Sequence, residues 1–217
     1  MGQTGTGSRR ARVAVLLSGS GRTLRNLLDH TRRQDAPVEI VQVISTRKRV
    51  AGNDIAHEAG IPLEVVPRRA YDSAESFSDD VIRVLDDIAA DLVVCAGFLS
   101  KLVVPERYMG KVLNIHPSLL PLFGGQGFYG DRVHQAVLDS GMKVSGCTVH
   151  FVDNAYDAGP IVAQQCVPVK PDETVDSLRQ RVFAAECELY PSIVFEVASG
   201  RIWQDGQTVR FQQGGAT

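Results

Sequence analysis

Short apolar runs alternate with helical patterns through the first half of the sequence, and this rhythm constrains the fold more than any other feature. The runs are rich in Val, Leu and Ile and lie at 12–17, 38–44, 62–66, 91–96 and 111–115. Patterns with helical spacing separate them at 22–33, 50–58 and 73–89. Because strands that alternate with helices form parallel sheets, we predict an α/β fold with a mostly parallel, twisted sheet and helices on both faces.

The second half has longer strand-like runs, a long helix and a final hairpin. The runs lie at 144–152 and 160–169 and are joined by a polar loop. A helical pattern over 175–198 is expected to break or restart near Pro191. The last pattern indicates a hairpin over 202–211 with Asp205-Gly206 at its turn. With no linker between the halves, we predict a single domain at 12–205, a flexible tail at 1–11, and a terminal hairpin strand and tail at 206–217.

Charge and hydropathy exclude several classes of function. Lys and Arg number 23 and Asp and Glu number 25, so the net charge of −2 argues against binding to duplex nucleic acid. The basic runs at 9–10, 46–49 and 68–69 are interpreted as solvated surface or as sites for a small anion. No apolar stretch reaches about 18 residues, and the N-terminus lacks the apolar core of a secretory signal. We therefore expect a cytoplasmic protein without a membrane segment.

The cysteines give no indication of a metal centre. Cys95, Cys147, Cys166 and Cys187 are widely spaced and lie in apolar segments. Zinc sites normally use closely spaced ligand pairs, which are missing from this sequence. We expect four buried thiols in a reducing compartment and no metal.

A glycine-rich turn follows the first predicted strand and begins the first helix. It reads Ser18-Gly-Ser-Gly-Arg-Thr23, and the free N–H groups at such a helix start favour an anion. The third glycine of a dinucleotide motif is replaced by Leu24, and the lysine of a nucleotide-triphosphate loop is absent. A single phosphate is therefore the expected ligand, and a simple tight turn is the alternative.

The segment Asn114-Ile-His-Pro-Ser-Leu-Leu-Pro121 is the strongest local feature. It begins at the end of a buried strand, where ligands collect in open α/β sheets. Asn114 and His116 face the same side of an extended strand, which pairs an amide donor with a group that exchanges protons near neutral pH. We predict a catalytic role for both residues.

Two acidic residues are further candidates. Asp157 lies in the 153–159 loop, where it is either an ordinary turn residue or a partner that raises the pKa of His116. Glu186 lies in an apolar stretch of the long helix, which indicates a specific partner or a solvated face. Among the other histidines, His150 is expected to be a satisfied strand residue, and His30, His57 and His134 to lie on helix surfaces.

Taken together, these motifs resemble a known family. Ser18-Gly-Ser-Gly21, Ala96-Gly-Phe-Leu99, Asn114–Pro121, Gly146–Val152 and Asp157–Ile161 occur in the order of the phosphoribosylglycinamide formyltransferases. The resemblance covers about residues 12 to 205 and implies a Rossmann-like formyltransferase fold. It also implies transfer of a formyl group from 10-formyltetrahydrofolate, as co-substrate, to the amine of glycinamide ribonucleotide in purine biosynthesis, without a metal.

The resemblance implies a role for each matching residue. Asn114, His116 and Asp157 match the catalytic trio, and Thr148 matches a hydroxyl near the catalytic aspartate. The substrate-binding residues it implies are Gly21, Arg22, Thr23 and Glu186. The folate pocket it implies is lined by Leu99, Ser100, Lys101, Leu102, Asn114, Asp153, Asn154 and Asp157. Arg22-Thr23 and Ala74 depart from the pattern of many relatives, and the Gly-rich 123–131 segment is expected to be a mobile flap.

The implied mechanism is direct formyl transfer. The expectation is that Asn114 and a protonated His116 stabilise the tetrahedral oxyanion, while Asp157 keeps His116 protonated. The alternatives are a formyltetrahydrofolate hydrolase, a methionyl-tRNA formyltransferase, and a non-catalytic folate- or nucleotide-binding module. The first two resemble longer proteins, and the third would not need the trio. We expect small-molecule partners and a monomer or homodimer.

Overall fold

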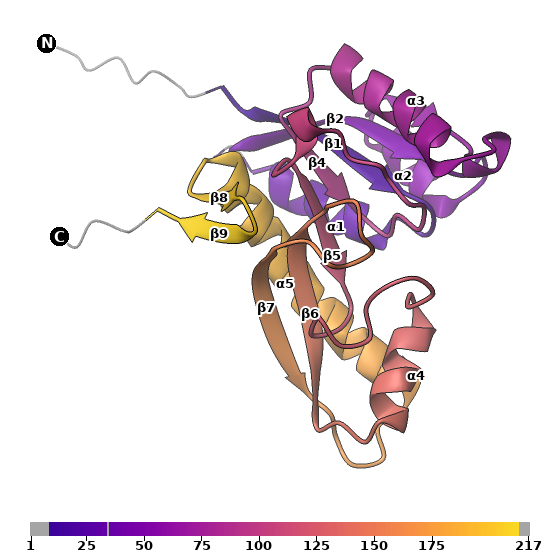
Figure 1. The fold of residues 1–217 in the computed structure, drawn as a ribbon, viewed down its shortest axis with the longest axis vertical. Coiled ribbons are helices and arrows are strands. Elements are labelled where there is room, and N and C mark those ends of the chain that lie inside the picture. Colours follow the sequence, from indigo (N-terminus) through magenta and orange to yellow (C-terminus); the bar gives the residue numbers. More distant parts are fainter. Residues whose placement is uncertain (1–8, 34, 213–217) are drawn as a thin grey trace, which may run out of the picture.

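The fold is built on one mixed sheet, which a computed structural model describes for residues 9–33 and 35–212 (Figure 1). The seven strands lie in the order β3-β2-β1-β4-β5-β6-β7. They span Ala11–Leu17 (β1), Val38–Ser45 (β2), Leu63–Val65 (β3), Leu92–Cys95 (β4), Val112–His116 (β5), Val144–Phe151 (β6) and Ile161–Pro168 (β7). Strands β1 to β5 run parallel to one another, and the β5–β6 and β6–β7 pairs are antiparallel, so the predicted mostly parallel sheet is confirmed.

Helices cover both faces of this sheet, as predicted. They span Arg22–Thr31 (α1), Ala51–Glu58 (α2), Ala74–Asp87 (α3), Asp131–Asp139 (α4) and Val175–Ala198 (α5). Single 3-10 turns lie at Arg68–Ala70 and Glu106–Tyr108, and strands β8 (Ile202–Asp205) and β9 (Thr208–Phe211) form the terminal hairpin. Figure 1 shows α3 on one side of the upper half and α5 crossing behind the long strands.

The strand β1 shows why the central strands are apolar throughout. Successive side chains of a strand point to opposite faces, so both faces need apolar residues when both are covered. Val13, Val15 and Leu17 pack with α1, α2 and α5, whereas Ala14 and Leu16 pack with α3. This burial fixes β1 in the interior of the sheet, with its carboxyl end beside that of β4.

The long helix α5 differs from the prediction because it continues through Pro191. Proline lacks an N–H and would leave the carbonyl four residues earlier, that of Cys187, without its helical partner. The side chain of Asn26 in α1 donates to that carbonyl at 3.0 Å. Further along, the hydroxyl of Tyr190 lies 3.0 Å from the carbonyl oxygens of Cys95 and Leu113, which holds α5 against β4 and β5.

Two predictions about burial are wrong. His134 lies on α4, but it faces inward and is buried rather than on the surface. Cys166 is exposed because it lies on the edge strand β7, and Cys187, on α5, is half-buried. Cys95 and Cys147 are buried as expected. The predicted tail at 1–11 and the end of the 206–217 segment lie largely outside the described residues and stay predictions, although β1 already begins at Ala11.

Candidate active site

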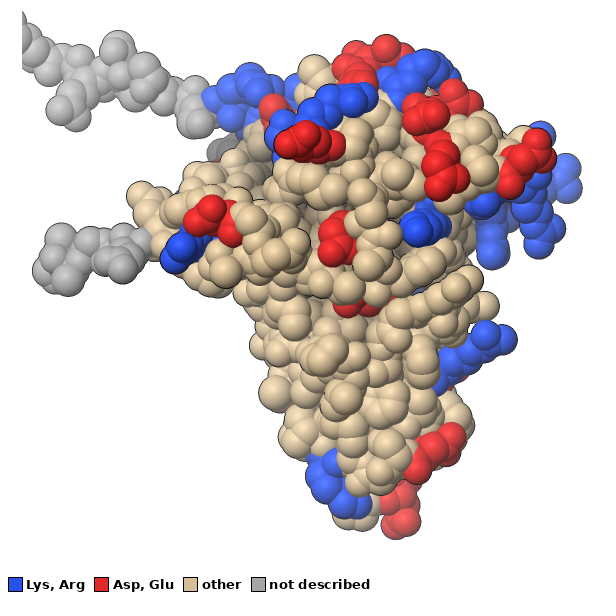
Figure 2. All heavy atoms as spheres, in the orientation of Figure 1, with Lys and Arg blue, Asp and Glu red and all other residues tan. Residues whose placement is uncertain are grey.

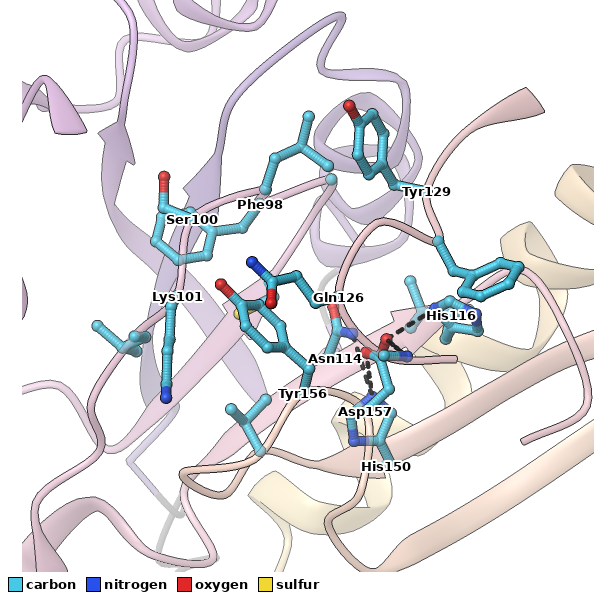
Figure 3. Close-up of a pocket in the computed structure, with 18 of the residues that line it drawn as sticks. Phe98, Ser100, Lys101, Asn114, His116, Gln126, Tyr129, His150, Tyr156 and Asp157 are labelled. Carbon is cyan, nitrogen blue, oxygen red and sulfur yellow. Dashed lines mark hydrogen bonds and ion pairs between the residues drawn. The ribbon is translucent and has the colours of Figure 1, made fainter. Parts of the chain in front are cut away.

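A cavity of about 540 Å³ opens at the carboxyl ends of β4 and β5. Its walls come from the segments after these strands, the 125–132 loop and the 152–157 loop. Figure 3 shows Asn114, His116, His150 and Asp157 grouped on one side, and Phe98, Ser100, Lys101 and Tyr156 on the other. Three segments far apart in the sequence therefore bring their polar side chains to one hollow.

His116 is the last residue of β5 and is 4% exposed. Its Nε2 lies 2.8 Å from the carbonyl oxygen of Phe123, which can only accept a hydrogen bond, so Nε2 carries the proton. The other nitrogen, Nδ1, lies 3.6 Å from Oδ2 of Asp157. In the neutral ring, Nδ1 is therefore a bare, basic nitrogen that faces a carboxylate.

Asp157 is held in a strained turn. Its φ of 52° lies in the left-handed region, which is uncommon for residues other than glycine. The backbone N–H of Gly125 donates to its Oδ2 at 2.9 Å. Gly159, two residues later, packs so tightly that an added Cβ would lie 2.0 Å from the carbonyl oxygen of Phe151. The turn is thus fixed by close packing, as is typical where strain serves a functional site.

His150 takes part in the site, a role that the sequence did not indicate. Its Nδ1 lies 2.9 Å from the carbonyl oxygen of Phe151 and therefore carries the proton in the neutral ring. Its Nε2 then accepts from Nδ2 of Asn114 at 3.1 Å and lies 3.7 Å from Oδ1 of Asp157. This contact orients the Asn114 amide and leaves its second N–H free for a ligand in the cavity (Figure 3).

The pKa of His116, beside Asp157, differs from expectation. Burial lowers the pKa of His116, and this effect outweighs the opposing influence of Asp157 and the Phe123 carbonyl. Burial alone would raise the pKa of Asp157, but its contacts with His150, His116 and the Gly125 N–H outweigh burial and lower it. The expected rise in the pKa of His116 is therefore wrong, because an ion pair at 3.6 Å does not compensate for loss of water. At neutral pH the pair consists of a neutral imidazole and a carboxylate.

The hydrogen bonds of the Thr148 hydroxyl run to the segment after His116, although the resemblance placed this hydroxyl near Asp157. The hydroxyl donates to the carbonyl of Ser118 at 2.7 Å and accepts from the N–H of Leu120 at 3.0 Å. The side chain of Gln164 also donates to it at 3.0 Å. Thr148 therefore shapes the turn that follows His116 rather than the reacting groups.

The glycine-rich turn forms an uncapped helix start. Gly21 is the N-cap residue of α1, has a φ of 71°, and offers no side chain to bond the first N–H groups of the helix. Ser18 is buried and accepts from the Thr46 hydroxyl at 2.7 Å and from the N–H of Leu99 at 3.0 Å. These bonds fix the turn beside the cavity wall, so its free N–H groups can receive an anion.

Glu186 lies on α5 and lines the cavity, as does Thr23. Burial raises the pKa of Glu186 to about 7, and the nearby Arg22 partly offsets this rise. The Arg22 guanidinium lies 3.7 Å from the centre of the Phe183 ring, which holds it over α5. Gly21 and Arg22 are not among the cavity-lining residues, whereas all eight residues predicted for the folate pocket are.

Two of those eight residues also stabilise the wall of the cavity. Leu102 is 4% exposed and contributes to the core. The amide of Asn154 is engaged with the backbone of Val104, accepting from its N–H at 2.8 Å and lying 3.3 Å from its carbonyl oxygen. Asn154 therefore fixes the 152–157 loop against the 99–104 segment and shapes the cavity wall.

The 123–131 segment folds over the cavity. Gln126 points into the cavity between Tyr156 and Asn114, and Tyr129 lies at its edge (Figure 3). The rings of Phe123 and Phe128 are 6.3 Å apart, which packs the segment on itself. The sequence identified this segment only by its glycines and gave no indication that Gln126 lines the cavity.

Within the ranges 9–33 and 35–212, no group of three or more His, Cys, Asp or Glu residues is placed to hold a metal ion. In the same ranges, no helix combines the length and the apolar character needed to cross a membrane.

Comparison with known proteins supports a specific chemistry for this site. The family model described as formyl transferase matches residues 11–194. A phosphoribosylglycinamide formyltransferase of Haemophilus influenzae is 34% identical over 194 residues, which cover 88% of this chain and 89% of that protein. The solved structure of glycinamide ribonucleotide transformylase 1 from Symbiobacterium toebii is 37% identical, with a TM-score of 0.85 and coverage of 93% and 94% of the two chains.

The mammalian relatives are much longer. The trifunctional purine biosynthetic protein adenosine-3 of Bos taurus is 45% identical over 196 residues, which cover 89% of this chain. The matched part is 19% of that protein, so the chain spans about a fifth of its length.

Proposed function

The chain belongs to the formyl transferase family, and from this membership and the site we infer that it transfers the formyl group of 10-formyltetrahydrofolate to the amine of glycinamide ribonucleotide. The products are formylglycinamide ribonucleotide and tetrahydrofolate, in purine biosynthesis. The observation that carries the proposal is the convergence of Asn114, His116 and Asp157 on one cavity. A cytoplasmic location and a monomer or homodimer remain our predictions.

The cavity suits the two proposed substrates. Its volume of about 540 Å³ is within the range of sites for small molecules. Phe98 and Tyr156 offer aromatic surface to a flat heterocycle, and the backbone at 99–102 offers polar groups to its edge. At the other end, the helix start at Gly21 offers N–H groups to a phosphate, and Glu186 offers a carboxyl group to ribose hydroxyls.

His116 is proposed to move the proton in the reaction. The amine nitrogen attacks the formyl carbon and forms a tetrahedral oxyanion, and the nitrogen must then lose a proton. Neutral Nδ1 of His116 can accept it, and the carboxylate of Asp157 stabilises the imidazolium that results. As the bond from the formyl carbon to N10 of the folate breaks, N10 takes the proton from His116. This replaces the expected role of a permanently protonated His116.

Asn114 is proposed to stabilise the oxyanion. One N–H of its amide is engaged with His150, and this contact directs the other toward the cavity. A donor of this kind is typically worth about 10²–10³-fold in turnover. Since the chemistry is carried by the formyl folate, the protein supplies position and charge.

The test incubates the native chain with both substrates and follows deformylated folate by absorbance. We expect folate turnover only when glycinamide ribonucleotide is present, and a loss of at least about a hundredfold in Asn114→Ala and in His116→Ala. His57→Gln, at an exposed position of α2, is the matched control and should retain native turnover. Turnover without glycinamide ribonucleotide would identify a hydrolase instead, and binding of both ligands without turnover would identify a binding module.

A further inference from the structure

The loop between β2 and α2 carries three consecutive cationic side chains, and the proposed mechanism assigns none of them a role. Arg47, Lys48 and Arg49 are all exposed. None of their side chains forms an ion pair with an acid in the described part of the chain, whereas the neighbouring Arg25 pairs with Glu58 at 3.0 Å. Figure 2 shows Lys and Arg atoms projecting from the right-hand edge of the upper half, on the side to which the central strands of Figure 1 point.

This loop is built against the glycine-rich turn. The N–H of Thr46 donates to the carbonyl of Leu17 at 3.0 Å, and the N–H of Gly52 donates to the carbonyl of Gly19 at 3.1 Å. A Cβ on Gly21 would lie only 2.5 Å from the Cα of Gly52. The two loops therefore pack backbone against backbone, with no side chain between Gly21 and Gly52.

Buried polar side chains hold the backbone of this loop in place. The amide of Asn53, which is 5% exposed, donates to the carbonyls of Arg47 at 2.9 Å and Lys48 at 3.2 Å. The hydroxyl of Ser45 also donates to the carbonyl of Arg47 at 2.9 Å. The backbone of the loop is thus fixed, although its three side chains are free to reach into solvent.

The separation between this loop and the helix start favours long-range electrostatic attraction of an anion rather than a fixed contact with it. Arg49 is three residues from Gly52, and with about 3.8 Å between successive Cα atoms the two lie within about 11 Å. This is close to the screening length of about 8–10 Å at moderate ionic strength. The acid on the adjoining helical turn, Asp54, offsets one charge and leaves an excess of two.

We propose that Arg47, Lys48 and Arg49 form a cationic rim that captures the phosphate-bearing substrate and guides it to the helix start at Gly21. The inference rests on the proposed function, since it assigns the phosphate of glycinamide ribonucleotide to that end of the cavity. A dianion that approaches the rim is attracted before it reaches the N–H groups of α1, which raises the rate of productive encounter. The rim acts on capture and not on the chemical step.

The test compares the triple variant R47Q/K48Q/R49Q with native protein at low and high ionic strength. With formyl folate saturating, we expect kcat/KM for glycinamide ribonucleotide to fall about threefold to tenfold at low salt, while kcat is retained. The difference should disappear at high salt because screening removes the attraction. The matched control K111Q/K143Q/K170Q removes the same charge from three exposed lysines outside this loop and should keep the native salt dependence.

The outcomes separate this inference from the proposed function. A triple variant with the same salt dependence as the lysine control would overturn the rim while transfer by the native chain still supports the function. A loss confined to the KM of formyl folate would also overturn it, because the rim would then serve the other substrate. Absence of transfer by the native chain would refute the function and, with it, this role of the rim.

Discussion

Replacing Asp157 by Asn removes a charge but keeps the shape of the side chain, so it isolates what the carboxylate does. The amide oxygen can still accept from the N–H of Gly125, which lies 2.9 Å from Oδ2 in the native site. What is lost is the attraction between the carboxylate and the imidazolium that His116 becomes during transfer. We expect Asp157→Asn to fold and to bind both substrates but to turn over slowly.

The geometry gives the scale of this loss. Opposite unit charges 3.6 Å apart attract by about 4 to 5 kcal/mol at an effective dielectric constant of about 20. This is an upper limit, because the site can relax and admit water. If somewhat more than half of this limit is realised, the loss is about 2.7 kcal/mol, or about a hundredfold in kcat.

The pH dependence of the same variant gives a second, independent result. Neutral His116 is required as the base, so activity rises as the pH increases through the pKa of His116, which burial holds below its ordinary value of 6.5. Asp157 raises that pKa, so its removal should shift the acid limb of the pH profile to lower pH. Asp139→Asn, on the exposed side of α4, is the control for charge. A folded Asp157→Asn variant with kcat within about threefold of native and an unchanged acid limb would refute the reasoning.

Three further predictions concern burial, strain and pH. Glu186→Gln should be more stable than native protein at pH 8 by up to about 3 kcal/mol and equal to it below pH 4.5, because burial raises the pKa of the native carboxyl to about 7 and its ionisation in the folded state is therefore costly. The KM of this variant for glycinamide ribonucleotide should rise. Urea denaturation measures the stability, and steady-state kinetics measure the KM. Gly21→Ala should lose about 1–3 kcal/mol in urea denaturation, because its Cβ would lie 2.5 Å from the Cα of Gly52 at a φ of 71°, and native-like stability would contradict this. Burial lowers the pKa of His134 to about 4, so native stability should fall as the pH drops from 6.5 toward 4, and His134→Gln should flatten that fall in a series of urea midpoints.

The sheet could be predicted because its signal is local and redundant. Each apolar run marked a strand to within two residues, since a strand buried on both faces must be apolar throughout. The break at Pro191 was wrong for a non-local reason. The carbonyl that proline leaves free is satisfied by Asn26, more than a hundred residues earlier in the chain, and no local pattern contains that contact.

The sequence predicted which residues form the candidate site but not the protonation state of His116. Asn114 and His116 are two residues apart on one strand, so their common direction follows from strand geometry. That Asp157 lies near His116 required the resemblance to a family, because their distance is set by how the 152–157 loop packs. The burial of His116 is a property of the folded chain, and the resulting loss of water reverses the expected direction of the pKa shift.

The role of His150 depends on strand register. It lies opposite Asn114 in the antiparallel pair β5–β6, so the two side chains are cross-strand neighbours. The sequence did not reveal that register, because the loops on either side of α4 do not determine how β6 aligns with β5. A histidine on a strand was therefore interpreted as structural, although it directs the Asn114 amide.

The central claim is that His116 is neutral at pH 7, with a bare Nδ1 beside Asp157 that can take the proton of the attacking amine. Nitrogen-15 NMR of the histidine side chains, with His116 assigned by comparison with His116→Asn, tests it directly. We predict one protonated nitrogen, Nε2, at pH 7, and a titration midpoint below 6.5. Two protonated nitrogens at pH 7 would contradict the account.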